Sequence, residues 1–213
     1  MTLQYIYLHG FASGTKSAKA QAIGDRFAKI QTQLKIPDLN AGNFTQLTIT
    51  RQINQVAAEF INHSAPVTLI GSSLGGLVAA HLGQQYPQVQ RLILLAPAFG
   101  FLSHWLPKLG DDTVKRWQNE KYLTVYHYGE ARSLPLSYDF VIDAQKYQEN
   151  LLQRPIPTLI LHGIEDDVIP ITASRDFAKT RPLVKLITLE SDHALANVTT
   201  EIWQEICLFC QLP

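Results

Sequence analysis

Residues 67–82 read VTLIGSSLGGLVAAHL, and this stretch decides the fold. An apolar, β-branched run leads into Gly71-Ser72-Ser73-Leu74-Gly75, and small residues at helical spacing follow it. The pattern predicts a buried strand, a sharp turn with Ser73 at its apex, and a helix. Such a turn strains the backbone, so the two flanking positions need glycine. The alternative is a glycine-rich turn that only reverses the chain.

Strands and helices alternate along most of the chain around this motif. We expect strands at 4–8, 34–37, 67–70, 91–95, 158–161 and 184–189, and helices at 17–33, 50–63, 74–86, 174–179 and 199–210. This alternation is typical of a mainly parallel sheet covered by helices on both faces. The sequence therefore predicts a single α/β domain over residues 1–213.

Residues 98–154 interrupt the alternation and are rich in aromatic side chains. Segments 122–128 and 136–142 could form two strands of a hairpin around Gly129-Glu130. We expect an insertion that covers the carboxyl edge of the sheet, where open α/β sheets bind ligands. An ordinary crossover with its own apolar packing is the alternative interpretation.

Composition excludes several classes of partner. The 213 residues carry 18 basic and 18 acidic side chains, so there is no electrostatic argument for nucleic acid or an anionic membrane. No apolar run has membrane-spanning length, and residues 1–8 lack a secretory signal, which favours the cytoplasm. Cys207 and Cys210 lie in a helical pattern and are interpreted as buried apolar residues, so no metal site is expected.

A serine nucleophile needs a base, and the base needs an orienting acid. His193 follows the last expected strand and is the predicted base. Asp166 follows the strand before it and is the predicted acid, with Asp167 and Glu165 as rivals. Adjacent side chains in an extended segment point to opposite sides, so only one of the two aspartates should meet the histidine.

Acyl transfer also needs two donors for the developing oxyanion. The backbone N–H of Leu74, directly after Ser73, is one candidate. The loop after the first strand, with His9 and Gly10 shaping it, offers the N–H of Phe11 as the other. A plain glycine turn before a helix is the alternative for this loop. This chemistry needs no metal and no cofactor.

The chain resembles the α/β-hydrolase superfamily over its whole length. Four stretches are similar to the small YqiA-type bacterial esterases: YIYLHGFASGTKSAKA (5–20), GSSLGG (71–76), LPLSYDFVIDAQKY (134–147) and LILHGIEDDVIP (159–170). The resemblance implies a compact hydrolase fold without the usual first strands. It also implies Ser73 as nucleophile, Asp166 as acid and His193 as base. The chain departs from this family at Gly14-Thr15, where a serine–proline pair is expected.

These features together predict a serine esterase that acts on a small-molecule acyl ester. A thioesterase or a carbon–carbon bond hydrolase could use the same three residues. A non-catalytic binding module is the alternative from another class, although it would have no need of all three groups. No pattern in the sequence specifies the acyl group or an oligomeric state.

Overall fold

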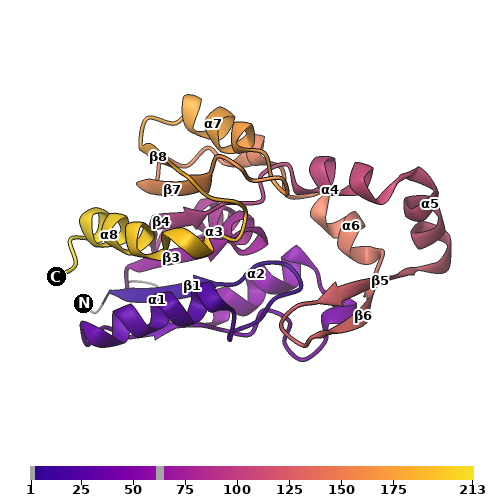
Figure 1. The fold of residues 1–213 in the computed structure, drawn as a ribbon, viewed down its shortest axis with the longest axis horizontal. Helices are drawn as coiled ribbons and strands as arrows, with labels where there is room; N and C mark the ends of the chain where they lie inside the picture. Colours follow the sequence, from indigo (N-terminus) through magenta and orange to yellow (C-terminus); the bar gives the residue numbers. More distant parts are fainter. Residues whose placement is uncertain (1–2, 61–64) are drawn as a thin grey trace.

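The computed structural model describes residues 3–60 and 65–213 of the chain. Within this part, six parallel strands form one sheet in the order β2-β1-β3-β4-β7-β8 (Figure 1). The strands are β1 Gln4–Leu8, β2 Leu34–Lys35, β3 Val67–Ser72, β4 Val89–Leu95, β7 Thr158–Gly163 and β8 Val184–Leu189. The predicted α/β class with a mainly parallel sheet is confirmed.

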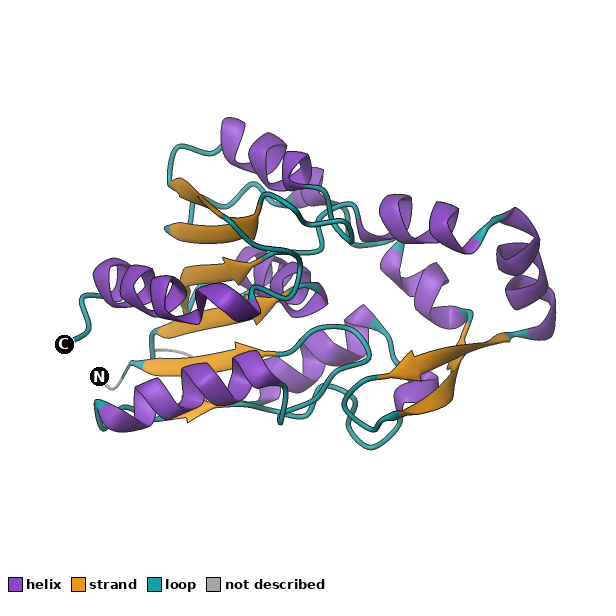
Figure 2. Ribbon diagram, viewed as in Figure 1, coloured by secondary structure: helices purple, strands orange, loops and turns teal. Residues whose placement is uncertain are grey.

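Helices cover both faces of the sheet, as the secondary-structure colouring of Figure 2 shows. Helices α1 (Ala18–Lys29) and α8 (Thr199–Cys210) pack on one face. Helices α2 (Ile49–Ala58), α3 (Leu74–Gln85) and α7 (Ile171–Lys179) pack on the other. On α8, Cys207 and Cys210 are free thiols, and Cys210 is buried while Cys207 is half-buried.

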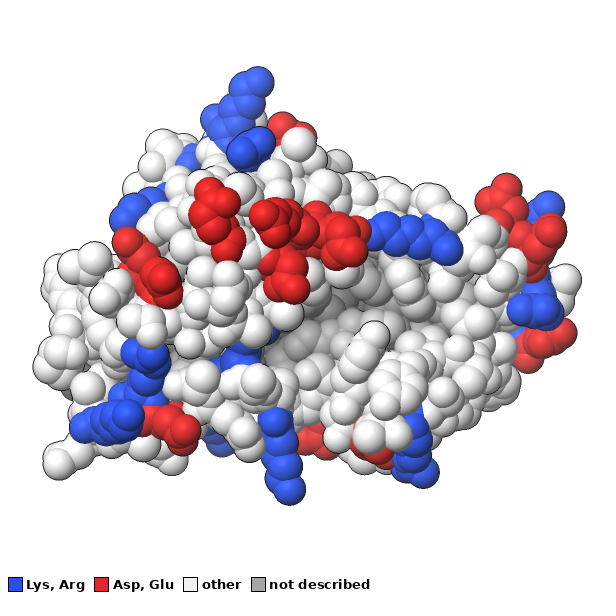
Figure 3. All heavy atoms as spheres, in the orientation of Figure 1, with Lys and Arg blue, Asp and Glu red and all other residues white. Residues whose placement is uncertain are grey.

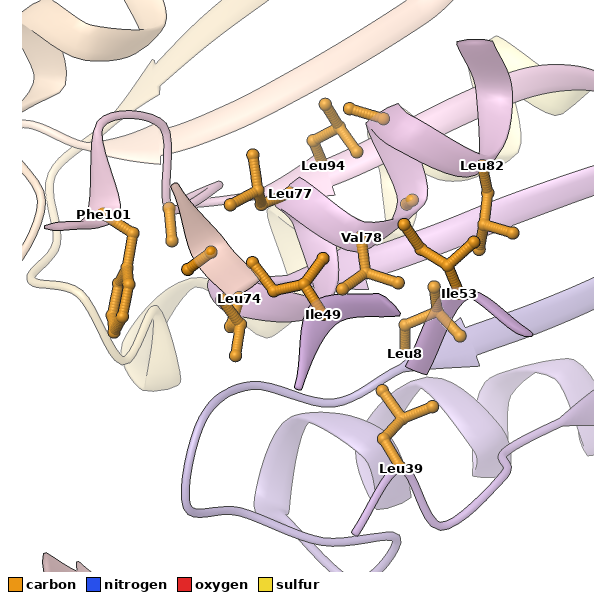
Figure 4. Packing of buried hydrophobic residues seen from close by; sticks show 14 of the residues in the cluster. Leu8, Leu39, Ile49, Ile53, Leu74, Leu77, Val78, Leu82, Leu94 and Phe101 are labelled. Carbon is orange, nitrogen blue, oxygen red and sulfur yellow. The ribbon is translucent and has the colours of Figure 1, made fainter. Parts of the chain in front are cut away.

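Two apolar cores result, one on each face, because side chains of a strand point alternately to opposite sides. Ile6 and Leu8 of β1 enter the core that α2 and α3 share, whereas Tyr5 and Tyr7 enter the core beneath α1 and α8. Figure 4 shows the first of these cores, with Leu8 near the apolar residues of α2 and α3. All of β1 is buried, and after Gln4 it carries only aromatic and aliphatic side chains, as expected for a parallel strand covered on both faces.

Between β4 and β7 the chain leaves the sheet. It forms α4 (Phe101–Leu109), α5 (Asp111–Glu120), the antiparallel pair β5 (Tyr122–His127) and β6 (Arg132–Ser137), α6 (Asp139–Ala144) and the short helix η2 (Glu149–Leu151). In Figure 1 these elements lie beyond the carboxyl ends of the parallel strands. Two further short helices are η1 (Phe44–Gln46) and η3 (Ala196–Val198).

The predicted strand at 136–142 is wrong. Strand β6 covers residues 132–137, and residues 139–144 form α6. The register pairs Tyr122, the first residue of β5, with Ser137, so residues beyond Ser137 have no strand to pair with. Phe140, Val141 and Ala144 are instead buried at helical spacing.

Several element ends also differ from the expectation. Helix α1 ends at Lys29 rather than at residue 33, because Gln31 has a φ of 53° and the N–H of Thr32 donates to the carbonyl of Phe27. Helix α2 ends at Ala58, and residues 61–63 of the expected helix lie outside the described residues. Among the residues described, no helix has both the length and the apolar character needed to cross a bilayer.

Candidate active site

Ser73 lies at the turn between β3 and α3 with a φ of 52° and a ψ of −118°. Few residues other than glycine adopt this region, so the backbone is strained there. A Cβ on Gly71 would overlap the carbonyl group of Gly75, and a Cβ on Gly75 would overlap the carbonyl of Leu8. The N–H of Ser73 donates to the carbonyl of Leu95 over 2.9 Å. The neighbouring strands therefore hold the turn, and only glycine fits on either side of the serine.

His193 connects Ser73 with Asp166. Its Nε2 lies 3.0 Å from the Oγ of Ser73, and its Nδ1 lies 2.7 Å from Oδ2 of Asp166. An ionised carboxylate only accepts, so in the neutral histidine Nδ1 carries the proton and Nε2 accepts from the serine hydroxyl. The structure thus joins three residues from the ends of β3, β7 and β8 in one hydrogen-bonded series.

Asp166 is buried and accepts four hydrogen bonds. Its Oδ1 accepts from the N–H groups of Val168 and Ile169 at 2.9 and 2.8 Å. Its Oδ2 accepts from Nδ1 of His193 and lies 3.0 Å from Nε2 of His162, whose N–H is shared with the carbonyl of Ile169. Burial raises the pKa of Asp166, but the bonds from the two histidines outweigh burial and hold that pKa well below its usual range. The carboxylate therefore stays ionised beside His193.

The two rival acids point elsewhere. The side chains of Asp167 and Glu165 are exposed, whereas only 8% of Asp166 is exposed. The segment is a turn followed by a bend rather than an extended strand, and Asp166 is the buried residue between two exposed pairs, residues 164–165 and 167–168. The structure places Asp166, and neither neighbour, against the histidine ring.

The loop after β1 lies against the serine turn. A Cβ on Gly10 would lie 3.3 Å from the Cβ of Ser73, so the following residue, Phe11, is close to the predicted nucleophile. His9 supports the loop: its Nε2 accepts from the N–H of Leu39 at 3.0 Å, and its Nδ1 donates to the carbonyl of Gly10 at 3.0 Å. On the other side, Leu74 begins α3, so its N–H has no intrahelical acceptor.

The segment between β4 and β7 contributes aromatic rings beside this loop. The ring of Phe11 contacts those of Phe101, Trp105 and Phe140, with centroids 5.2–5.8 Å apart. The N–H of Gly129, at the tip of the β5–β6 hairpin, also donates to the carbonyl of Ala12. The segment therefore contacts the loop that holds one predicted oxyanion donor.

The surface between the sheet and this segment is hollowed (Figure 3). Most atoms lining the hollow belong to uncharged residues, while Asp and Glu side chains gather along one edge. The ammonium of Lys108, on α4, donates to the carbonyls of Asp167 and Val168. The segment thus contacts both the loop of the predicted acid and the loop of the predicted oxyanion donor.

Sequence reasoning missed two residues of this site. His162 is not among the residues predicted for the site, yet its fully buried ring reaches Asp166, while its Nδ1 accepts from the hydroxyl of Ser174 at 2.7 Å. The only sequence feature that could have suggested this contact is that His162 and Asp166 are four residues apart. Lys19 of α1 donates to the carbonyl of His193, and no local sequence pattern predicts that contact.

Comparison with known proteins places the chain in a family. Residues 4–210 match the model of a family described as "Uncharacterised protein family (UPF0227)". The chain belongs to this family. The YqiA-like resemblance expected from the sequence is thereby confirmed.

Solved structures similar to this UPF0227 member share its fold. A putative hydrolase from Agrobacterium vitis superposes with a TM-score of 0.85 at 22% identity, covering 97% of this chain and 87% of that one. Mouse alpha/beta hydrolase domain-containing protein 10 has a TM-score of 0.79 at 23% identity, with 98% and 88% covered. Est1E from Butyrivibrio proteoclasticus, with ferulic acid bound, has a TM-score of 0.80 at 20% identity, with 99% and 88% covered. The α/β-hydrolase fold is therefore confirmed.

One curated relative is more similar in sequence but much longer. The human acylamino-acid-releasing enzyme is 28% identical over 176 residues. The match covers 76% of this chain and 22% of that protein. The UPF0227 chain thus spans about a fifth of the length of this relative.

Proposed function

We propose that this protein is a serine esterase that hydrolyses small acyl esters through Ser73, His193 and Asp166. The observation that carries the proposal is the series of two hydrogen bonds, 3.0 Å from Ser73 to His193 and 2.7 Å from His193 to Asp166, at a strained strand-to-helix turn. A base within hydrogen-bond reach of the nucleophile and oriented by an acid is the arrangement that activates a serine hydroxyl.

In the first half of the reaction, the Oγ of Ser73 attacks the acyl carbonyl carbon while Nε2 of His193 takes the hydroxyl proton. The carbonyl oxygen becomes an oxyanion, and the N–H groups of Phe11 and Leu74 donate to it. The dipole of α3 adds favourable charge at the same point. His193 then passes the proton to the leaving alkoxide, which departs as an alcohol and leaves an acyl ester on Ser73.

In the second half, a water molecule attacks the acyl-enzyme while Nε2 of His193 takes one of its protons. The new oxyanion uses the same two donors. When it collapses, the carboxylic acid is released and the proton returns to the Oγ of Ser73. Asp166 stays ionised throughout, because its four hydrogen bonds keep its pKa low, and it stabilises the transient imidazolium.

The aromatic rings beside the site support an apolar substrate group. Phe101, Trp105 and Phe140 surround Phe11, and the nearby hollow has few charged side chains. We expect activity on p-nitrophenyl esters to rise as the acyl chain lengthens from acetate, because each added methylene buries apolar surface. A flat dependence on acyl length would argue against an apolar acyl site.

The decisive test is turnover of these esters by the wild type and Ser73→Ala. We expect Ser73→Ala to lose at least about 10³-fold in kcat, with an unchanged circular dichroism spectrum. Ser72→Ala, at the neighbouring serine, is the matched control and should retain most of the activity. The wild type should also react with a fluorophosphonate probe at Ser73.

Three outcomes separate this proposal from its alternatives. Full activity in Ser73→Ala would exclude the mechanism. A wild type that neither turns over esters nor reacts with the probe would favour a binding module. Acyl thioesters cleaved with a higher kcat/KM than matched oxygen esters would identify a thioesterase on the same three residues.

A further inference from the structure

Lys19 lies in the first turn of α1, next to the loop that carries His193. Its ammonium donates to the backbone carbonyl of His193 over 3.3 Å, across 174 residues of sequence. The charges that act most strongly on this ammonium are those of Asp166 and Asp192. A lysine from a separate element therefore contacts the backbone of the proposed base and is close to the proposed acid.

Local physics disfavours a cation at this position. The first turn is the positive end of the helix dipole, and α1 has no acidic residue there to offset a positive charge. Burial lowers the pKa of Lys19 to about 8, even though Asp166 and Asp192 act in the opposite direction. Within residues 3–60 and 65–213, the structure records no ion pair for Lys19. The positive charge of Lys19 therefore does not stabilise helix α1.

The contact matters for the loop that joins β8 to η3. Asp192 and Ala194, on either side of His193, are both exposed. Within the loop, Oδ1 of Asp192 accepts from the N–H groups of Ala194 and Leu195 at 2.9 and 3.2 Å. These bonds shape the turn, and the N–H of Glu165 joins the loop to the segment after β7 by donating to the carbonyl of Ser191 at 3.1 Å. The Lys19 bond fastens the backbone of His193 itself to α1.

We propose that Lys19 is a positioning residue for His193. Its ammonium holds the histidine backbone so that the ring stays between Ser73 and Asp166, and its positive charge favours the neutral ring over the imidazolium. This inference rests on the proposed function. The charged groups facing the ring and the ammonium are Asp166 from the β7 loop, Asp192 from the histidine loop, and Lys19 itself.

The variant Lys19→Met removes the charge and the donor but keeps the length of the side chain. Lys16→Met is the matched control, since Lys16 is exposed, three residues earlier, and has the same charge. We expect kcat of Lys19→Met to fall about tenfold with KM within about twofold, because a small displacement of a catalytic group costs turnover. Lys16→Met should match the wild type.

The pH dependence separates positioning from a purely structural role. Lys19 contacts the backbone of His193, so loss of its charge removes a repulsion on a positively charged ring. The acidic limb of kcat/KM should then move upward by about 0.3–0.5 pH unit in Lys19→Met. Lys19→Arg should keep the wild-type limb and recover part of kcat, whereas Lys19→Gln, a neutral donor, should show the shifted limb.

A titration of the His193 ring by NMR gives the same shift without any substrate, with the signals assigned by their loss in His193→Gln. Wild-type kcat and a wild-type His193 titration in Lys19→Met would overturn the proposal, whatever the melting temperature. An equal shift in Lys16→Met would also overturn it, as a general charge effect. If Lys19→Met does not fold, Lys19→Gln takes its place with the same criteria. Failure of the proposed function would instead appear as a wild type without ester turnover or labelling.

Discussion

At the scale of single residues, Asp166 is the centre of the candidate site. Its two carboxylate oxygens accept from two backbone N–H groups and two imidazole rings, which come from separate parts of the chain. Four donors fix the carboxylate in one orientation and hold it ionised. The neighbouring Asp167 has an exposed side chain, and its backbone carbonyl accepts from Lys108.

Because Asp166 is buried and hydrogen-bonded whereas Asp167 is exposed, the same change from aspartate to asparagine should affect kcat unequally at the two positions. Asp166→Asn should lower kcat by about 10³-fold, because an amide cannot hold the histidine in the required tautomer. Asp167→Asn should change kcat by less than about twofold, as expected at an exposed site. Measuring kcat for both with the same ester decides the acid, and a larger loss in Asp167→Asn would contradict the assignment.

At the scale of elements, α3 determines where Ser73, the proposed nucleophile, lies. Its first residue follows Ser73, and its last turn is held by Arg154 from the segment before β7. One guanidinium nitrogen of Arg154 donates to the carbonyls of Gly83, Tyr86 and Val89 at 2.6–2.9 Å, and the other donates to that of Pro87 at 2.8 Å. These carbonyls include groups at the end of the helix that have no intrahelical partner.

Arg154→Met should therefore lower the free energy of unfolding by about 2–3 kcal/mol, because several carbonyls lose a charged donor. The activity of the folded variant should stay near wild type, since Arg154 is far along α3 from Ser73. Arg132→Met, whose guanidinium pairs with Glu130 on an exposed surface, should lose less than about 1 kcal/mol. Equal losses in a urea titration of the two variants would refute the cap role of Arg154.

At the scale of the whole molecule, the site lies where the sheet, the helices on its two faces and the segment between β4 and β7 meet. Two apolar cores hold the helices against the sheet. The segment then contacts the body through Lys108 at the acid loop and through Gly129 at the loop of Phe11. The global fold and the local site therefore depend on the same loops.

The stability of the molecule should consequently depend on the ionisation of Asp166. Its pKa is lower in the folded protein than in the unfolded chain, so its contribution is complete above the unfolded pKa of about 4 and is lost as pH falls below that value. Between pH 6 and pH 3, Asp166→Asn should lose less unfolding free energy than the wild type. Asp167→Asn is the control and should follow the wild-type dependence in urea titrations; parallel slopes for all three proteins would contradict the prediction.

The amino-acid sequence is enough to predict where the sheet-forming segments lie along the chain and which residue types follow them. Local patterns suffice for this, because a glycine turn around Ser73 and apolar runs before Asp166 and His193 are properties of short stretches. The carboxyl ends of parallel strands meet at one edge, so three distant residues could be assigned to one site. The α/β fold followed from the same alternation.

The tertiary structure alone decided the contacts between remote segments. The choice of Asp166 over Asp167 depends on which side chain the folded loop turns toward His193. The end of β6 at Ser137 depends on the length of its partner strand. Lys19 reaches His193 only because α1 packs beside the last loop. Each of these contacts joins segments that are distant in the sequence and that meet only because the two apolar cores are buried. A local pattern of residues therefore cannot predict it.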